Sequence, residues 1–325
     1  MSTQEKGQGH FPYHWRIRGT RRGWLFRVGT LAVLGWGGSL RPGHAAHPPQ
    51  RRGPAHFKLS LAAYSFNRWL PRNWTPEHLQ TARFTLEQFI DFCADQNLDA
   101  CELTAYYFPR AITNDYLLTL KERAFRLGLS ISGTAIGNDF CTADAQKLAE
   151  QIAMTKAWID HSAVLGAPCI RIFAGNVPPG ETEEQARARC VQAIATCLEY
   201  AATKGVALAL ENHGGITATA DQLLQIVRDV PASPWFGVNF DSGNFRVADP
   251  YAELEKIAPY AINAQIKVEM EPPEGGRVPA DLERVVEILR RAGYRGFLTL
   301  EYEAAADPWE AIPRHLQTLR QLIHA

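Results

Sequence analysis

Short apolar runs alternate with longer amphipathic segments from Phe57 to the C-terminus. The short runs are apolar and compact, as buried strands are, whereas the longer segments repeat apolar residues at the three- and four-residue spacing of helices. Such alternation indicates repeated βα units and a parallel sheet. Eight units fit the size of a closed (β/α)8 barrel, so we predict a single TIM-barrel domain, α/β in class, over residues 57–325. Strands are expected at 58–64, 100–103, 129–134, 169–173, 206–210, 236–240, 262–266 and 297–300, and helices at 85–96, 115–127, 143–165, 181–204, 220–230, 250–257, 280–292 and 309–323.

Polar residues share one face in each of the last four predicted strands. Successive side chains of a strand point to opposite faces, so a barrel strand has one face under the helices and one inside the barrel. In the segment 206–211 the even positions are aliphatic, and the odd positions carry two alanines and Glu211. The next three strands follow a similar alternation. Their predicted inward residues are Gly237, Asn239 and Asp241, then Asn263, Gln265 and Lys267, and finally Thr299 and Glu301.

Each of these four strands delivers an oxygen-bearing side chain near its end. The C-terminal ends of barrel strands meet at one mouth, where barrel enzymes hold their active sites. We therefore expect convergence there of Glu211, Asp241, Gln265 and Glu301. Three carboxylates brought together without matching Arg or Lys repel one another unless a cation or protons neutralise them. The pattern predicts a metal site, and a cluster of buried polar residues that satisfy one another is the alternative.

Motifs in this region resemble those of a known family. They are LENHGG at 210–215, NFDSGN at 239–244, QIK at 265–267, and AGYRGF at 292–297 leading to LEY at 300–302. Their order at successive strand ends is similar to that of the sugar phosphate isomerase/epimerase family, the xylose isomerase-like TIM barrels. The resemblance extends from about Phe57 to the C-terminus.

The resemblance implies one bound divalent metal ion. In that family a Glu, an Asp, a His and a Glu from the last four strands hold the ion, which corresponds here to Glu211, Asp241, Gln265 and Glu301. Gln265 departs from the pattern because the family usually has His there. Its amide oxygen still suits a hard cation, so the set favours Mg2+ or Mn2+, with Zn2+ as an alternative. Direct and water-mediated binding by Gln265 both stay open.

The family arrangement also implies a proton-transfer reaction. A divalent ion that bridges two adjacent oxygens of a hydroxy-ketone stabilises the enediolate formed when a neighbouring C–H proton is removed. Glu211 and Glu301, on opposite sides of the metal, would be the catalytic base and acid. We therefore expect an isomerase or epimerase of a sugar or keto-sugar. Two alternatives stay open: a metal-assisted lyase or dehydratase on a keto-glycoside or polyol, and a non-catalytic sugar-binding barrel.

Five further residues are candidates for substrate binding. Glu102 and Arg171 end early strands at inward positions and would orient substrate or bind each other across the barrel. His213 would hydrogen-bond a hydroxyl group or be a plain loop histidine, and Asn244 would contact substrate or cap the next helix. Lys267 would stabilise an oxyanion or pair with the acids that follow it. An apolar wall for the sugar, or ordinary core packing, is expected of Trp69, Tyr106, Tyr107, Phe108 and Phe140.

The loop after the seventh predicted strand argues against a phosphorylated substrate. TIM barrels usually hold phosphate in the loops after the seventh and eighth strands. Here the first of these loops, residues 269–277, carries three carboxylates. We therefore predict that the sugar is not phosphorylated.

The distribution of charge disfavours a nucleic-acid partner. The 325 residues contain 34 Lys and Arg and 34 Asp and Glu, but residues 1–45 hold seven of the basic residues and one of the acids. The rest of the chain therefore has 27 basic and 33 acidic residues, a net charge of about −6. Nucleic-acid binding needs clustered Lys and Arg, so we expect a small carbohydrate partner and no nucleic acid. Association into a homo-oligomer stays open.

The basic N-terminal segment resembles a twin-arginine export signal. Arg21 and Arg22 precede an apolar stretch, residues 28–40, that is too short to span a bilayer. Small residues then suit a signal peptidase that cleaves before Ala46. We expect a signal peptide at 1–45, a flexible leader at 46–56, export to the periplasm or the medium, and no stable membrane insertion after cleavage. A disordered basic tail with an accidental arginine pair is the alternative.

The six cysteines lack the spacing of a zinc site or a CxxC motif. Most of them fall within apolar strand or helix patterns. We therefore expect packed thiols rather than a disulfide framework.

Overall fold

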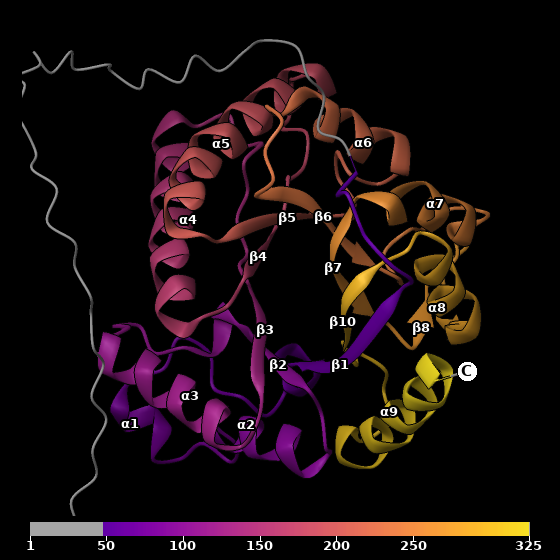
Figure 1. Cartoon of the computed structure of the whole chain (residues 1–325). Coiled ribbons are helices and arrows are strands. Elements are labelled where there is room, and N and C mark those ends of the chain that lie inside the picture. Colours follow the sequence, from indigo (N-terminus) through magenta and orange to yellow (C-terminus); the bar gives the residue numbers. More distant parts are fainter. Residues whose placement is uncertain (1–47, 325) are drawn as a thin grey trace, which may run out of the picture. The chain divides into compact units, whose positions relative to one another are not determined.

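Eight parallel strands close into a barrel in the computed structural model, which describes residues 48–324 (Figure 1). Around the barrel the order is β1-β10-β7-β6-β5-β4-β3-β2, so consecutive strands of the chain lie side by side and the last pairs with the first. This confirms the predicted TIM barrel. The strands are β1 (His56–Ala62), β2 (Ala100–Thr104), β3 (Ser130–Ala135), β4 (Cys169–Ile172), β5 (Ala207–Glu211), β6 (Phe236–Asp241), β7 (Ala261–Ile266) and β10 (Arg295–Leu300).

Helices surround the barrel on its outside (Figure 1). Every helix expected from the sequence is present. They are α2 (Leu86–Asp95), α3 (Asn114–Arg126), α4 (Ala145–Leu165), α5 (Glu183–Lys204), α6 (Ala220–Asp229), α7 (Pro250–Ile257), α8 (Leu282–Arg291) and α9 (Pro308–His324).

Several short elements were not expected from the sequence. Helix α1 (Pro76–Leu79) lies in the loop after β1, and 3-10 turns follow β1 and β2. In the acidic loop after β7, β8 (Glu269–Met270) pairs antiparallel with β9 (Val278–Pro279). The pairing places the acidic loop in a defined hairpin beside the barrel mouth.

Local sequence explains where several helices begin and end. Thr85, Thr182 and Thr219 each accept a hydrogen bond from the backbone of a Gln three residues on, whose side chain bonds back to the threonine N–H. These reciprocal capping boxes satisfy free N–H groups at the starts of α2, α5 and α6. Helix α5 ends at Gly205, which has a φ of 69°, a left-handed conformation that glycine adopts without a Cβ clash.

The two faces of the barrel strands have the predicted chemistry. Leu208 and Leu210 of β5 are fully buried in the hydrophobic core. In contrast, Asn263 of β7 donates a hydrogen bond to Glu102 of β2, a strand that is not its neighbour in the barrel. This bond crosses the interior of the barrel. Asn263 and Glu102 therefore point inward, as predicted.

The described part of the predicted leader contacts the barrel. Arg51 donates hydrogen bonds of 2.7 Å to the Ala292 carbonyl and 2.5 Å to the Ala261 carbonyl, before the chain enters β1. The predicted signal peptide and the first two leader residues lie outside the described residues. Within residues 48–324, none of the helices combines the length and the apolar character that a membrane span requires. All six cysteines are buried free thiols, as predicted.

Candidate active site

The four predicted metal ligands lie at the same mouth of the barrel. Glu211 and Asp241 are the last residues of β5 and β6, Gln265 is the second last of β7, and Glu301 directly follows β10. Each side chain is buried, with no more than 5% of the residue exposed. Buried carboxylates require charge compensation, so their neighbours decide what the site can do.

Glu211 is held by three polar side chains. One of its oxygens, Oε2, lies 3.1 Å from Arg171 Nε and accepts a 2.8 Å hydrogen bond from Asn239 Nδ2. The other, Oε1, accepts a 3.0 Å hydrogen bond from Asn244 and lies 4.0 Å from His213 Nε2. Arg171 therefore pairs with Glu211 and not with Glu102. Asn244 positions this carboxylate.

Lys267 lies among three carboxylates. Its Nζ is 2.5 Å from Glu301 Oε2, 3.0 Å from Glu303 Oε2 and 3.5 Å from Asp241 Oδ2. From the sequence alone we expect no Arg or Lys to match the converging acids. The structure corrects this assumption, because the side chains of Lys267 and Arg171 both enter the cluster. The acids that follow Lys267 in the sequence, Glu269 and Glu271, are not among these partners.

A negative charge remains after this compensation. Four buried carboxylates face two buried cations, which leaves two negative charges if all the groups are ionised. Burial, together with the charge of Glu301, raises the pKa of Asp241 to about 7, although Lys267 opposes the shift. The Oδ2 atom of Asp241 is buried without a hydrogen-bond partner. The buried groups are Glu102, Glu211, Asp241 and Glu301 as acids, and Arg171 and Lys267 as cations.

The donor chemistry of this cluster fits a hard divalent cation. Its charge would balance the two excess negative charges, and the unpaired Asp241 oxygen is a ligand of the kind that Mg2+ and Mn2+ prefer. The arrangement is not preformed, however. Within residues 48–324, no three Asp, Glu, His or Cys side chains are placed to hold an ion together. Holding one requires the carboxylates to draw together and the Lys267 ammonium to give way.

Gln265 forms a bridge across the barrel. Its Nε2 donates a 2.6 Å hydrogen bond to Glu102 Oε1, and its Oε1 accepts a 2.7 Å hydrogen bond from Asn239. Asn263 donates to the other Glu102 oxygen. Burial and the charge of Glu301 nevertheless raise the pKa of Glu102 to about 7. Glu102 thus orients Gln265, whose carbonyl oxygen keeps one lone pair free.

Phe173 was not identified from the sequence as a site residue. Its ring lies 3.9 Å from the Arg171 guanidinium and 4.0 Å from the His213 ring. Desolvation, reinforced by the positive charges of Arg171 and Lys267, lowers the pKa of His213 to about 4, although the side chain is 52% exposed. The imidazole is therefore neutral near pH 7. Phe173 reads in the sequence as one more apolar strand residue, so only packing reveals it.

The loop after β6 approaches Lys267 closely. A Cβ atom on Gly243 would lie 2.6 Å from Lys267 Cγ and 2.9 Å from the Glu269 carbonyl oxygen. Ser242 accepts a 2.8 Å hydrogen bond from the Lys267 backbone N–H. The Asn212 side chain accepts a hydrogen bond from the Asp241 backbone N–H and donates one to the Asp241 carbonyl. These two bonds hold the end of β6 against the residue that follows β5.

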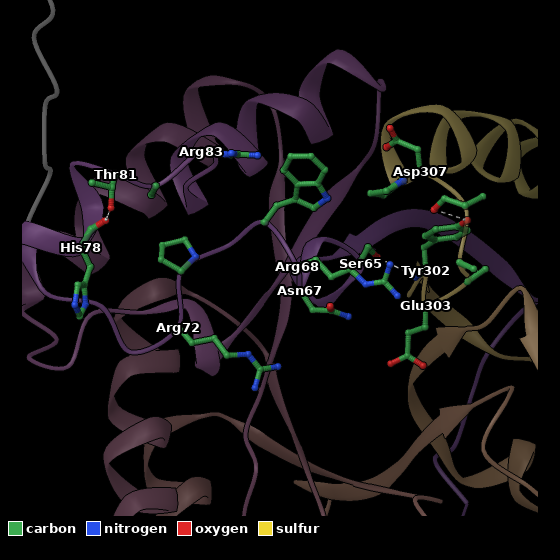
Figure 2. A pocket seen from close by; sticks show the side chains of 17 residues that line it. Ser65, Asn67, Arg68, Arg72, His78, Thr81, Arg83, Tyr302, Glu303 and Asp307 are labelled. Carbon is green, nitrogen blue, oxygen red and sulfur yellow. Dashed lines mark hydrogen bonds between the residues drawn. The ribbon is translucent and has the colours of Figure 1, made fainter.

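Two cavities lie beside these residues. The smaller, about 70 Å³, is lined by Asn244, Lys267, Glu301 and Glu303 among others. The larger, about 880 Å³, lies between the loop after β1 and the segment after β10 (Figure 2). Of the aromatic residues predicted to form a wall, Trp69 lines the larger cavity. Core packing accounts for the fully buried Tyr107, Phe108 and Phe140.

Solved structures share this fold. L-ribulose 3-epimerase is 19% identical, with a TM-score of 0.65 over 82% of this chain and 94% of that one. A xylose isomerase-like TIM barrel protein from Mycobacterium smegmatis in complex with magnesium is 16% identical, with a TM-score of 0.62 over 83% and 96%. The apo form of 3-keto-D-glucoside 4-epimerase from E. coli is 15% identical, with a TM-score of 0.61 over 82% and 99%. At these identities the likeness establishes the fold.

The sequence matches no curated protein. Residues 90–322, however, match a family described as xylose isomerase-like TIM barrel. This match covers most of the barrel and includes every strand end that carries a predicted ligand. The chain belongs to the xylose isomerase-like TIM barrel family.

Proposed function

We propose that the chain is a divalent-metal-dependent isomerase or epimerase of an unphosphorylated sugar or keto-sugar. The observation that carries the proposal is the pair of buried carboxylates, Glu211 and Glu301, at one barrel mouth with a cationic side chain beside each. The L-ribulose 3-epimerase and the 3-keto-D-glucoside 4-epimerase that share the fold support a carbohydrate substrate. The acids of the hairpin after β7 disfavour a phosphate group at that position.

Glu211 would take a proton from the substrate carbon beside a carbonyl group. Burial raises the pKa of this carboxyl well above its usual range, although Arg171 opposes the shift. A carboxylate with a raised pKa is a stronger base than an exposed one. Asn239 and Asn244 fix its orientation by hydrogen bonds to the two oxygens.

Glu301 would return the proton from the other side. Lys267 donates a hydrogen bond to it in the metal-free protein, and the same ammonium, once an ion takes its place, would be free to donate to a substrate oxygen on which negative charge develops. Neutral His213 would donate a hydrogen bond to, or accept one from, a substrate hydroxyl. Proton return to the opposite face of the same carbon gives an epimer, and return to the neighbouring carbon gives an isomer.

Glu211, Asp241 and Glu301 would hold the metal, with Gln265 as a carbonyl ligand or as the anchor of a bound water. Mg2+ or Mn2+ suits this oxygen set, and the magnesium complex of the protein from Mycobacterium smegmatis supports that choice. The bound ion would act as a Lewis acid that polarises two adjacent substrate oxygens.

Incubation of the purified protein with a panel of ketoses in D2O tests the proposal. With added Mn2+ or Mg2+, NMR should show deuterium on the carbon beside the carbonyl and the appearance of an epimer or isomer. A panel of free sugars and keto-sugars that shows no exchange with either ion would refute the activity. A sugar phosphate that exchanges faster than its free sugar would refute the unphosphorylated substrate.

A lyase acting on a keto-glycoside is the second candidate. The 880 Å³ cavity beside the carboxylates favours it, because this space exceeds what one sugar ring needs and would hold a leaving group. Release of the aglycone from a 3-keto-glycoside, in the same D2O experiment, distinguishes the lyase from the epimerase.

A further inference from the structure

The larger cavity has two walls from distant parts of the sequence. Residues 65–83, which follow β1, form one wall, and residues 302–308, which follow β10, form the other (Figure 2). Ser65 joins them, because its hydroxyl accepts a 2.9 Å hydrogen bond from the Tyr302 backbone N–H and donates one of 3.4 Å to the Leu300 carbonyl. The floor of the cavity is therefore fixed to the end of the last barrel strand.

The larger cavity adjoins the candidate active site. Glu303 and Ala304 line both the larger and the smaller cavity. Glu303 lies 3.0 Å from Lys267 Nζ, which in turn contacts Glu301. A ligand whose reacting part lies at the barrel mouth can therefore extend into the larger cavity.

Three arginines give the larger cavity a positive charge. Arg68, Arg72 and Arg83 line it, and all three are exposed. Within residues 48–324, none of them forms an ion pair with an acid, in contrast to many other arginines of the barrel. The predicted net charge of the chain beyond residue 45 is about −6, so general surface charge does not account for this group.

Both acids that line the larger cavity already have polar partners. Glu303 pairs with Lys267, and Asp307 accepts a 3.0 Å hydrogen bond from the Trp309 backbone N–H at the start of α9. Figure 2 shows these two acids on the wall opposite Arg72 and Arg83. Arg72 lies over the Tyr106 ring, 5.1 Å from its centroid, but the described residues give none of the three guanidinium groups an acidic partner, so their charge is available to an anion from solution. Trp69 adds an aromatic surface to the same cavity.

We propose, on the basis of the function proposed above, that the substrate is a glycoside whose remote part carries a carboxylate. The sugar lies at the barrel mouth, and the remote part lies in the larger cavity, where the positive charge of Arg68, Arg72 and Arg83 attracts its carboxylate and Trp69 packs on its apolar body. A volume of about 880 Å³ is in the range that takes a ligand larger than one sugar. Guanidinium groups match the planar geometry of a carboxylate.

Binding measurements on the intact protein test this inference without requiring turnover. The probes are 4-carboxyphenyl β-D-glucoside and its neutral isostere 4-carbamoylphenyl β-D-glucoside, titrated calorimetrically. The carboxylate should bind about tenfold more tightly than the amide, as expected for charge-assisted hydrogen bonds. The double variant Arg68→Gln, Arg83→Gln should lose this preference. The matched control Arg126→Gln, Arg228→Gln, on exposed parts of α3 and α6, should keep it.

Other outcomes overturn the inference. They are the absence of a preference for the carboxylate, binding of neither glucoside, and a preference that survives in the Arg68/Arg83 variant. Tighter binding of glucose 6-phosphate than of the carboxyphenyl glucoside would place the anion on the sugar itself and also contradict an unphosphorylated substrate.

The two proposals can fail separately. An arginine-dependent preference for the carboxylate with no proton exchange on any sugar would refute the proposed activity and leave this inference intact. Exchange on a free sugar without binding of either glucoside would refute this inference and leave the proposed activity intact.

Discussion

The ammonium nitrogen of Lys267 lies 2.5 Å from Glu301 Oε2 and joins the carboxylate after β10 to the one that ends β6. Asp241 Oδ2 is 3.5 Å from the same nitrogen and has no hydrogen-bond partner. Lys267 therefore contacts two of the carboxylates that would hold a metal ion. We infer that the lysine and the metal compete for these two carboxylates.

Replacing Lys267 by methionine should strengthen metal binding. The change removes a positive charge near the proposed ligands and frees Glu301 and Asp241, so Mn2+ should bind about tenfold more tightly. Calorimetric or EPR titration of Mn2+ measures this, with circular dichroism in EDTA to verify folding. Lys256→Met, on an exposed ion pair of α7, should leave Mn2+ affinity unchanged. Equal or weaker binding in the Lys267 variant would contradict the competition.

Replacing Glu211 or Glu301 by glutamine should abolish most proton exchange. Loss of a general base or acid typically lowers kcat by about 10²- to 10⁴-fold. The exchange rate of deuterium into a ketose substrate measures the effect. Glu122→Gln, on an exposed face of α3, is the matched control and should retain full exchange. Wild-type exchange in both site variants would show that neither carboxylate carries the proton.

The sequence predicted the barrel and the mouth where the site lies because both depend on local periodicity. The alternation of Leu208, Leu210 and Glu211 follows from the pleat of a strand, and so does the inward face of Asn263 and Gln265. A closed barrel then brings the strand ends together without further information. This explains why all eight strands and the burial of the four predicted ligands agree with the structure.

The partners within the site could not be predicted in the same way. The side chain of Lys267 is long enough to reach Glu301, Glu303 or the acids next to it in sequence. The structure shows it beside Glu301 and Glu303, with Gly243 packed close to its stem. Phe173 carries no polar signal at all. Periodicity specifies the face of a strand, whereas the choice of partner depends on distances between segments remote in the sequence.

Adding a methyl group at Gly243 should destabilise the protein. The Cβ atom would meet the Lys267 stem at 2.6 Å and a backbone carbonyl at 2.9 Å, and backbone cannot give way as a flexible side chain can. We expect Gly243→Ala to lower the free energy of unfolding by about 1–3 kcal/mol. Urea unfolding measures this. Thr119→Ala, on the exposed face of α3, should change it by less than about 0.5 kcal/mol, and an equal effect of the two variants would contradict the close contact.

Export by a twin-arginine signal is a separate proposal that the described residues do not address. Replacing Arg21 and Arg22 by lysines should leave uncleaved precursor inside the cell, because the paired arginines are the expected recognition element. Immunoblots of cytoplasmic and periplasmic fractions measure the distribution. Lysines in place of Arg16 and Arg18 are the matched control and should not change it. Normal export of the Arg21/Arg22 variant would refute the twin-arginine interpretation.

Glu102 should make the metal-free protein less stable as the pH rises. Burial and the charge of Glu301 raise the pKa of Glu102 to about 7, against 4.5 for an exposed Glu. Between these values the folded state binds more protons than the unfolded state, so the stability that this group contributes is present below about pH 4.5 and is lost as the pH rises through 7. The loss amounts to at most about 3 kcal/mol.

The variant Glu102→Gln tests this linkage because it cannot ionise. In EDTA, urea unfolding should show that the wild-type protein loses more stability between pH 5 and pH 7.5 than the variant does. The substitution itself lowers the free energy of unfolding. Gln265 and Asn263 both donate hydrogen bonds to Glu102, and one of them would face an amide N–H in the variant. This loss is the same at every pH. The test therefore compares how the free energy of unfolding changes with pH, and not its absolute value. Parallel curves for the two proteins would show that Glu102 stays ionised in the folded state throughout this range.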